Sequence, residues 1–284
     1  MSLELFTGMF LEWLREDMPM WDITTEQLGL ESVEAVAEVV CKSEWCIAAC
    51  TEEVGHALEK LGARVEAVAP SGERLRKGDV VLRFSGSAVL LLEVERVVLN
   101  TLIYASSIAT YTRMLVERAR SVNPRVRVAA TRKTVPGFRY CSKKAVAAGG
   151  GDTHRLTLSD AILVKDNHVA LVGSVREAVE RVRRSKSYVH RIIVEVHDVE
   201  EALEAVEAGA DAILIDNQPP EAVMEIVEAL EKRGLRDRVI VEVSGGIDEN
   251  NIVEYARLPI DVISVGRLTM PPLRVDMSMR VERR

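Results

Sequence analysis

The chain has 284 residues, of which 48% are hydrophobic and 29% are charged; this excludes a disordered chain and suits one large α/β domain or a barrel with a smaller companion. Its net charge of −7 argues against nucleic-acid binding, which needs extended basic surfaces. Charged residues interrupt the longest apolar stretch, and no basic region precedes an apolar one at the start. We therefore expect a soluble, cytoplasmic protein without membrane contact.

The first part of the chain has the pattern of a small α/β domain, which we place at residues 1–107. Apolar residues recur at helical spacing at the very start, and strand-like and helix-like patterns then alternate. The predicted elements are a helix near 2–17, a strand near 34–43, a helix over 51–62 that begins at a threonine and ends at a glycine, strands within 63–70 and 71–86, and a long helix over 92–120.

Three of the four cysteines lie close together in this part. Cys41, Cys46 and Cys50 are spaced C-x4-C-x3-C, and Cys141 lies far along the chain. A zinc site would need a fourth ligand, and the sequence contains no C-x2-C pair. Buried, reduced thiols are the favoured interpretation.

From about residue 108 the pattern changes to a βα repeat, because short β-branched runs alternate with helical segments at intervals of roughly thirty residues. The runs lie at 126–130, 161–164, 192–196, 212–215, 239–243 and 261–265. A parallel barrel and an open doubly wound sheet both fit this repeat.

Polar or glycine residues stand at or just after the end of each run. In α/β architectures the pocket forms at the carboxyl ends of the strands, so these residues are expected to converge on one pocket. They are Arg132 and Lys133 after the first run, Lys165 after the second, Glu195 within the third, Asp216 after the fourth, Ser244, Gly245 and Gly246 after the fifth, and Gly266 after the sixth.

Residues 131–168 carry a net positive charge, although the whole chain is negatively charged. The window holds seven Lys and Arg residues against three Asp residues, a surplus of 7 − 3 = 4. A basic window set among glycines predicts a pocket for a polyanion. Guanidinium groups match carboxylates and phosphates with two parallel hydrogen bonds, so Arg132 and Arg155 are the first candidates.

Other features of the predicted pocket allow two interpretations each. Glu195 and Asp216 suit a magnesium ion or a cationic transition state, or else an ion network with the lysines. His154 is either a core or capping histidine or a ligand-binding one. The glycine run 149–151 is favoured as a hinge or tight turn over a phosphate cradle.

Seven short motifs occur in an order that resembles the quinolinate phosphoribosyltransferases. They are TRKT-x-PG (131–137), GGGDTHR (149–155), L-x-KDNH (163–168), EV (195–196), DN (216–217), SGG (244–246) and SVG-x-LT (264–269). The likeness also extends back through ED (16–17), DITT (22–25) and ERVVLN (95–100), and so covers nearly the whole chain.

The resemblance implies an N-terminal α/β sandwich followed by an open, incomplete TIM-like α/β barrel over 108–270, with 271–284 returning to the first domain. It implies that quinolinate and phosphoribosyl diphosphate are converted to nicotinate mononucleotide, diphosphate and carbon dioxide, in NAD biosynthesis. It also implies Mg²⁺ as cofactor, and a homodimer with a shared active site or a higher homo-oligomer.

The resemblance also assigns roles to residues. Arg132, His154 and Arg155 are expected to bind the carboxylates of quinolinate, together with Arg96 from the other subunit. Lys133 and Lys165 are expected to contact quinolinate, the diphosphate or both. Glu195 and Asp216 are expected to face the ribose and to hold its metal directly or indirectly. The 5′-phosphate is assigned to Ser244, Gly245, Gly246 and Gly266.

Three positions depart from the pattern of the family: Ser107 replaces a glycine, Trp21 stands where a glycine is common, and Thr153 replaces a frequent asparagine. Ser107 and Thr153 bear on the fine shape of the pocket more than on the reaction. The alternatives are a nicotinate phosphoribosyltransferase, the related transferase associated with molybdate transport, which usually lacks KDNH, and a catalytically silent phosphoribosyl-ligand sensor.

Overall fold

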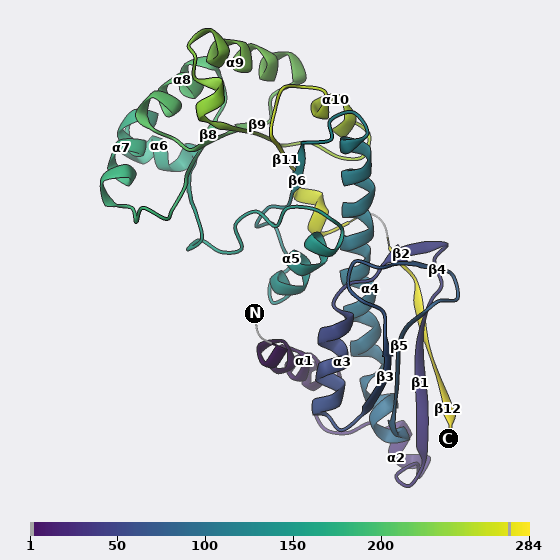
Figure 1. Ribbon diagram of the computed structural model, residues 1–284. Coiled ribbons are helices and arrows are strands. Elements are labelled where there is room, and N and C mark those ends of the chain that lie inside the picture. Colours follow the sequence, from purple (N-terminus) through teal and green to yellow (C-terminus); the bar gives the residue numbers. More distant parts are fainter. Residues whose placement is uncertain (1–2, 272–273) are drawn as a thin grey trace. The chain divides into compact units, whose positions relative to one another are not determined.

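The computed structural model describes residues 3–271 and 274–284, which divide into two compact units (Figure 1). The first unit contains the chain up to Arg113, Thr134–Gly150 and the chain from Met270 on. The second contains Met114–Lys133 and Gly151–Thr269. Neither unit is a single continuous stretch of sequence.

The first unit is built around a four-stranded antiparallel sheet of order β12-β1-β5-β3. The last strand of the chain pairs with the first, from Ala35 opposite Arg283 to Cys41 opposite Met277. Elements of this unit are α1 (Leu3–Asp17), α2 (Ile23–Gln27), β1 (Glu34–Cys41), β2 (Trp45–Ile47), α3 (Thr51–Lys60), β3 (Arg64–Val68), β4 (Arg74–Arg76), β5 (Val80–Ser87), most of α4 (Ala88–Arg120), α5 (Arg139–Ala148) and β12 (Met277–Arg283).

The core of this unit follows from amphipathic helices that cover the sheet. Phe6, Phe10 and Leu14 of α1 are spaced by four residues and are buried together on one side of the helix. Helix α3 packs against α1 and β3. The predicted helices and strands of the first domain are present, and the structure adds β2, β4 and β12 to them.

The second unit is built around a six-stranded parallel sheet of order β6-β11-β10-β9-β8-β7. Its elements are β6 (Arg127–Ala129), β7 (Ile162–Val164), α6 (Asp166–Val172), α7 (Val175–Ser185), β8 (Ile192–Val196), α8 (Val199–Ala208), β9 (Ala212–Asp216), α9 (Pro220–Lys232), η1 (Arg236–Arg238), β10 (Ile240–Ser244), α10 (Ile252–Ala256), β11 (Val262–Ser264) and η2 (Gly266–Thr269).

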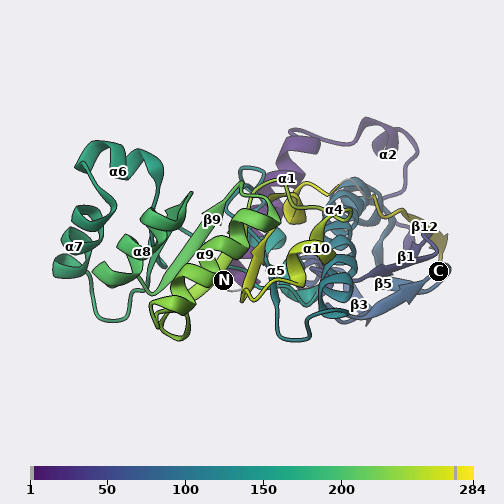
Figure 2. The same ribbon diagram turned by 90° about the horizontal axis from the view of Figure 1, so that it is seen from above.

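This sheet is open, because its edge strands β6 and β7 are not paired with each other in the part of the chain that the structure describes. Helices α7, α8 and α9 lie along the outer side of the strands (Figures 1 and 2). Their starts are fixed by local chemistry: Ser174 accepts a hydrogen bond from the Glu177 amide at the start of α7, and Asp198 accepts one from the Glu201 amide at the start of α8. The six predicted runs are the six strands.

Helix α5 lies in the first unit, within the range that the sequence assigns to the catalytic domain. Gly149, at its C-terminal end, explains the packing: a Cβ there would meet the carbonyl oxygen of Ala109 at 2.5 Å and Cβ of Thr112 at 2.6 Å. Only glycine lets α5 approach α4 this closely. Gly149 is therefore a packing residue and not a hinge, whereas Gly150, with a φ of +86°, has the turn conformation that the sequence also allows.

Helix α4 is long enough to reach across a bilayer, but Glu93, Glu95 and Arg96 lie in its first half. Within residues 3–271 and 274–284, no helix has both the length and the apolar surface that spanning a membrane requires.

Helix α5 also carries a buried ion pair that is testable. Lys144 contacts Glu53 of α3, whose side chain is 1% exposed, and Tyr140 donates a hydrogen bond of 3.1 Å to the same carboxylate. Lys144→Met is expected to lower the free energy of unfolding by about 3 kcal/mol, because it leaves a buried carboxylate without its counter-ion. Chemical denaturation monitored by circular dichroism measures this.

Lys232→Met is the matched control. It removes an exposed pair on α9, in which Lys232 Nζ lies 3.5 Å from Glu228. A loss below about 1 kcal/mol is expected there, because solvent screens the pair. Equal losses in the two variants would contradict the assignment of Lys144 to a buried pair.

Candidate active site

The carboxyl ends of the six parallel strands surround a cavity of about 320 Å³ in the second unit. Each strand contributes at least one side chain or the loop that follows it, as expected for an α/β sheet. The predicted residues that line it are Arg132, Lys133, His154, Arg155, Lys165, Glu195, Asp216 and Ser244. The strand-end prediction thus brings together residues separated by more than a hundred positions in the sequence.

The basic side of the cavity is formed by Arg132, His154 and Arg155. Burial lowers the pKa of Arg155, and the positive charge of Arg132 lowers it further. The Nε atom of Arg132 is buried and has no hydrogen-bond partner within the described residues. Two guanidinium groups held near each other, one with an unsatisfied donor, form a site that favours a ligand with more than one anionic group.

His154 has an unusual backbone conformation. Its φ of +52° lies in the left-handed region, and its amide donates a hydrogen bond of 2.8 Å to Oδ1 of Asp152. This contact fixes the turn that brings the ring to the cavity. Arg155 is fixed as well, because its Nη1 donates to the carbonyl oxygen of Ala161 at 3.1 Å.

The acidic side of the cavity contains Glu195 and Asp216, on the neighbouring strands β8 and β9. Lys165 Nζ lies 2.5 Å from Oε2 of Glu195, whose side chain is 6% exposed. Glu195, His197 and Asp216 each have a possible ligand atom within 4.8 Å of the others. Two carboxylates fit Mg²⁺, which prefers oxygen ligands and keeps several waters, whereas the imidazole of His197 is not a ligand that Mg²⁺ favours.

A glycine-lined depression of about 380 Å³ adjoins this cavity and shares Lys133, Ser244 and Ser264 with it. Gly245 has a φ of +95°, and a Cβ there would lie 2.2 Å from Oδ1 of Asn217, so no other residue fits. The predicted Gly246 and Gly266 also line the depression. Small residues and exposed backbone amides suit an approaching phosphate.

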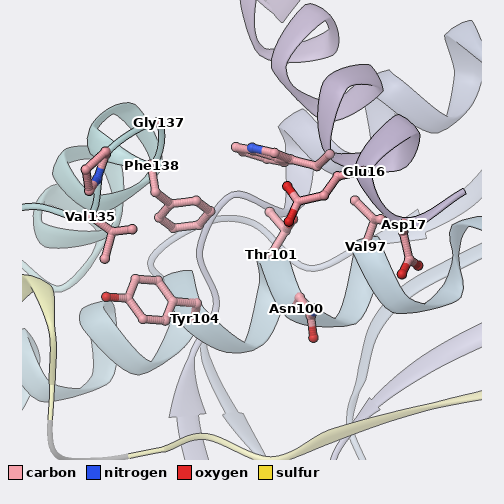
Figure 3. Close-up of a pocket in the computed structure, with 11 residues that line it drawn as sticks. Glu16, Asp17, Val97, Asn100, Thr101, Tyr104, Val135, Gly137 and Phe138 are labelled. Atoms are coloured by element: carbon pink, nitrogen blue, oxygen red, sulfur yellow. The ribbon is translucent and has the colours of Figure 1, made fainter. Parts of the chain in front are cut away.

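The first unit contains a cavity of its own, of about 540 Å³. Figure 3 shows Glu16 and Asp17 of α1 facing it, with Asn100 and Tyr104 of α4 opposite and Phe138 beside them. Its lining combines two acidic residues with the aromatic side chains of Trp13, Tyr104 and Phe138. This cavity contains none of the predicted site residues.

Comparisons with known proteins identify the family of the chain. A family model described as Quinolinate phosphoribosyl transferase, N-terminal domain, matches residues 22–106, and one described as Quinolinate phosphoribosyl transferase, C-terminal domain, matches residues 108–280. The chain belongs to the quinolinate phosphoribosyltransferase family.

Relatives of this family match over almost the full chain. The chain is 43% identical to a probable nicotinate-nucleotide pyrophosphorylase (carboxylating) of Methanothermobacter thermautotrophicus, over 95% of this chain and 96% of that protein. It is 45% identical to a protein of the same description from Archaeoglobus fulgidus, over 93% of this chain and 99% of that protein. The crystal structure of NadC from Streptococcus pyogenes matches with a TM-score of 0.91 and 33% identity, over 100% of this chain and 99% of that chain. The predicted α/β fold with an open parallel sheet is confirmed.

Arg96 is the one predicted site residue that lines neither cavity of the second unit. It lies on α4 in the first unit, with its side chain 58% exposed and 3.9 Å from Glu95. Of the positions that depart from the family pattern, Ser107 has a structural role, because its Oγ accepts a hydrogen bond from the Val275 amide. Trp21 is exposed, and Thr153 immediately precedes His154.

Not all basic residues of the window 131–168 line the cavity. Arg139, Lys143 and Lys144 belong to α5 in the first unit and do not line the cavity. For Lys144 the expectation of a polyanion ligand is wrong, because its partner is Glu53.

Sequence reasoning missed Glu242, which lines the cavity from β10, and Arg267, which lines the glycine depression. A signal for Glu242 exists: it stands in VIVEV as Glu195 stands in IIVEV, an acidic residue within a buried strand. Arg267 gives no such signal, because exposed arginines are common.

Proposed function

We infer that the chain transfers the phosphoribosyl group of phosphoribosyl diphosphate to quinolinate with decarboxylation, giving nicotinate mononucleotide, diphosphate and carbon dioxide in de novo NAD biosynthesis. The single observation that carries this function is the match of residues 22–106 and 108–280 to the two domains of the family. The cavity supports it, because two arginines and a histidine face one small space, as a dicarboxylate requires.

Each substrate has a chemically suitable part of the site. Quinolinate would be bound by Arg132, His154 and Arg155, which offer donors to two carboxylates. The 5′-phosphate would lie in the depression formed by the glycines after β10 and β11. Lys133 lines both spaces and would therefore contact the diphosphate between the two.

The residues can perform the chemistry without a protein nucleophile. As the bond from ribose C1 to diphosphate stretches, Lys133 and Lys165 would stabilise the departing negative charge. Glu195 and Asp216 would stabilise the oxocarbenium-like ribose, and they would also hold Mg²⁺, which neutralises diphosphate charge when bound. Arg132 and Arg155 would hold quinolinate while its ring nitrogen attacks. The positive nitrogen formed then stabilises the ring carbanion left when the adjacent carboxylate departs as carbon dioxide, and a proton from water takes the place of that carboxylate.

A homodimer is proposed, with Arg96 contributed to the other subunit's site. Arg96 is exposed on α4, one turn before Asn100, which lines the cavity of the first unit. That helix face and cavity are therefore available to a second copy of the chain. Higher assembly of such dimers is compatible with this arrangement.

The direct test is an assay with carboxyl-labelled quinolinate, phosphoribosyl diphosphate and Mg²⁺. One carbon dioxide is expected for each nicotinate mononucleotide formed, because decarboxylation accompanies the transfer. Nicotinate in place of quinolinate is expected to give no product, because it lacks the carboxylate that is lost and presents one anionic group to two arginines.

The role of Mg²⁺ is tested in the same assay by adding a chelator and then restoring the ion. Activity is expected to fall to background with the chelator and to return with Mg²⁺.

The substrate comparison also tests the main alternative. Product from nicotinate but not from quinolinate would identify a nicotinate phosphoribosyltransferase.

A further inference from the structure

Glu242 is a buried acid at the anion-binding cavity, and the proposed chemistry gives it no role. It lies on β10 with 3% of its surface exposed, and it lines the same cavity as Arg132 and Arg155. A carboxylate at a site for anions repels the ligand unless a cation neutralises it. The partner of Glu242 therefore decides what it does there.

Both oxygens of this carboxylate are directed by neighbours. Ser264, which is buried on β11, donates its hydroxyl hydrogen to Oε1 of Glu242. The other oxygen, Oε2, lies 3.4 Å from Nε2 of His154. The serine thus fixes the rotation of the carboxylate so that its second oxygen faces the imidazole ring.

His154 is held from both sides by this arrangement. Asp152 fixes its backbone in the left-handed region, and Glu242 faces ring atom Nε2. Nε2 is buried and makes no hydrogen bond among the described residues, so the Glu242 carboxylate at 3.4 Å is its charged neighbour, and the ring itself lines the cavity. The second ring nitrogen, Nδ1, is therefore the one left for a ligand.

We propose that Glu242 is a positioning residue that acts on quinolinate through His154. It holds the ring by Nε2 so that Nδ1 is available to a carboxylate of the substrate, and the histidine in turn separates the charge of Glu242 from the anion. This inference rests on the proposed function, because it takes quinolinate as the ligand of this cavity. Glu195 serves as a contrast, since Lys165 neutralises it directly.

The test is a double-mutant cycle on the full chain, with Glu242→Gln, His154→Ala and both together, and quinolinate affinity measured by calorimetry. Glu242→Gln keeps the shape and the acceptor for Ser264 but removes the charge facing His154. It is expected to weaken quinolinate binding about tenfold or more, and to change the affinity for phosphoribosyl diphosphate less than about twofold. In the His154→Ala background the same substitution is expected to have almost no effect on quinolinate affinity.

The outcomes separate the inference from the function on which it rests. If the wild-type protein does not bind quinolinate, the proposed function is wrong, and quinolinate is not the ligand of this cavity. If the wild type binds, additive effects in the cycle overturn the positioning role, and so does tighter binding by Glu242→Gln, which would mean simple repulsion. Equal weakening for both substrates would indicate general damage and would overturn the role too.

A second variant covers the case in which Glu242→Gln does not fold. Glu242→Asp retains the charge but withdraws it by one methylene from His154. It is expected to weaken quinolinate binding without changing the affinity for phosphoribosyl diphosphate. Unchanged quinolinate affinity in this variant would overturn the proposal.

Discussion

Arg155→Ala is expected to raise the dissociation constant of quinolinate about 100-fold, through loss of a charge-assisted pair of hydrogen bonds worth about 1.5–3 kcal/mol. The affinity for phosphoribosyl diphosphate is expected to change far less, because Arg155 lines the carboxylate side of the site and not the glycine depression. Isothermal calorimetry with each substrate alone measures both effects.

Two further variants make this result specific. Arg155→Lys keeps the charge but loses the planar fork, so an intermediate loss of quinolinate affinity is expected. Arg181→Ala removes an arginine of α7 that is 62% exposed and paired with Glu177, and it is expected to change neither affinity. Equal loss of both substrates in Arg155→Ala would contradict its assignment to quinolinate.

Arg96→Ala and Arg132→Ala are each expected to be almost inactive, but a mixture of the two proteins is expected to recover about one quarter of the wild-type activity. In a two-fold symmetric dimer, each site would combine Arg132 of one subunit with Arg96 of the other. After equal mixing, half of the dimers are mixed, and each mixed dimer has one intact site of two. Activity is measured after subunit exchange.

Exchange itself has to be demonstrated, for example with two affinity tags and co-purification. Recovery without exchange, or exchange without recovery, would contradict a site shared between subunits. Arg96 is exposed on α4 and is not among the residues that line the cavity, which is the reason to expect a shared site.

Much of the site could be predicted from sequence because a simple rule applies to it. Lys133, Lys165 and Asp216 follow or end buried parallel strands, and the carboxyl ends of such strands meet at one edge of the sheet. Each strand was visible as a short β-branched run. The periodicity of the runs and the polar residues that follow them therefore suffice to predict a common pocket.

The rest depended on packing that a linear pattern does not contain. Lys144 lies in the same basic window as Lys133, yet it pairs with Glu53, ninety-one positions away. Gly149 has the same sequence context as a hinge, and only the closeness of α4 shows that it is a packing residue. Glu242 was missed because it lies inside an apolar strand pattern, and such a pattern predicts core residues.

The pairing of β12 with β1 has a consequence for the synthesis of the protein. β1 comprises Glu34–Cys41, whereas its partner β12 comprises Met277–Arg283 and is made much later. One edge of β1 therefore has no native partner while the ribosome translates more than two hundred residues, and free strand edges attract other chains. This topology therefore exposes the growing polypeptide to aggregation before its first sheet is complete.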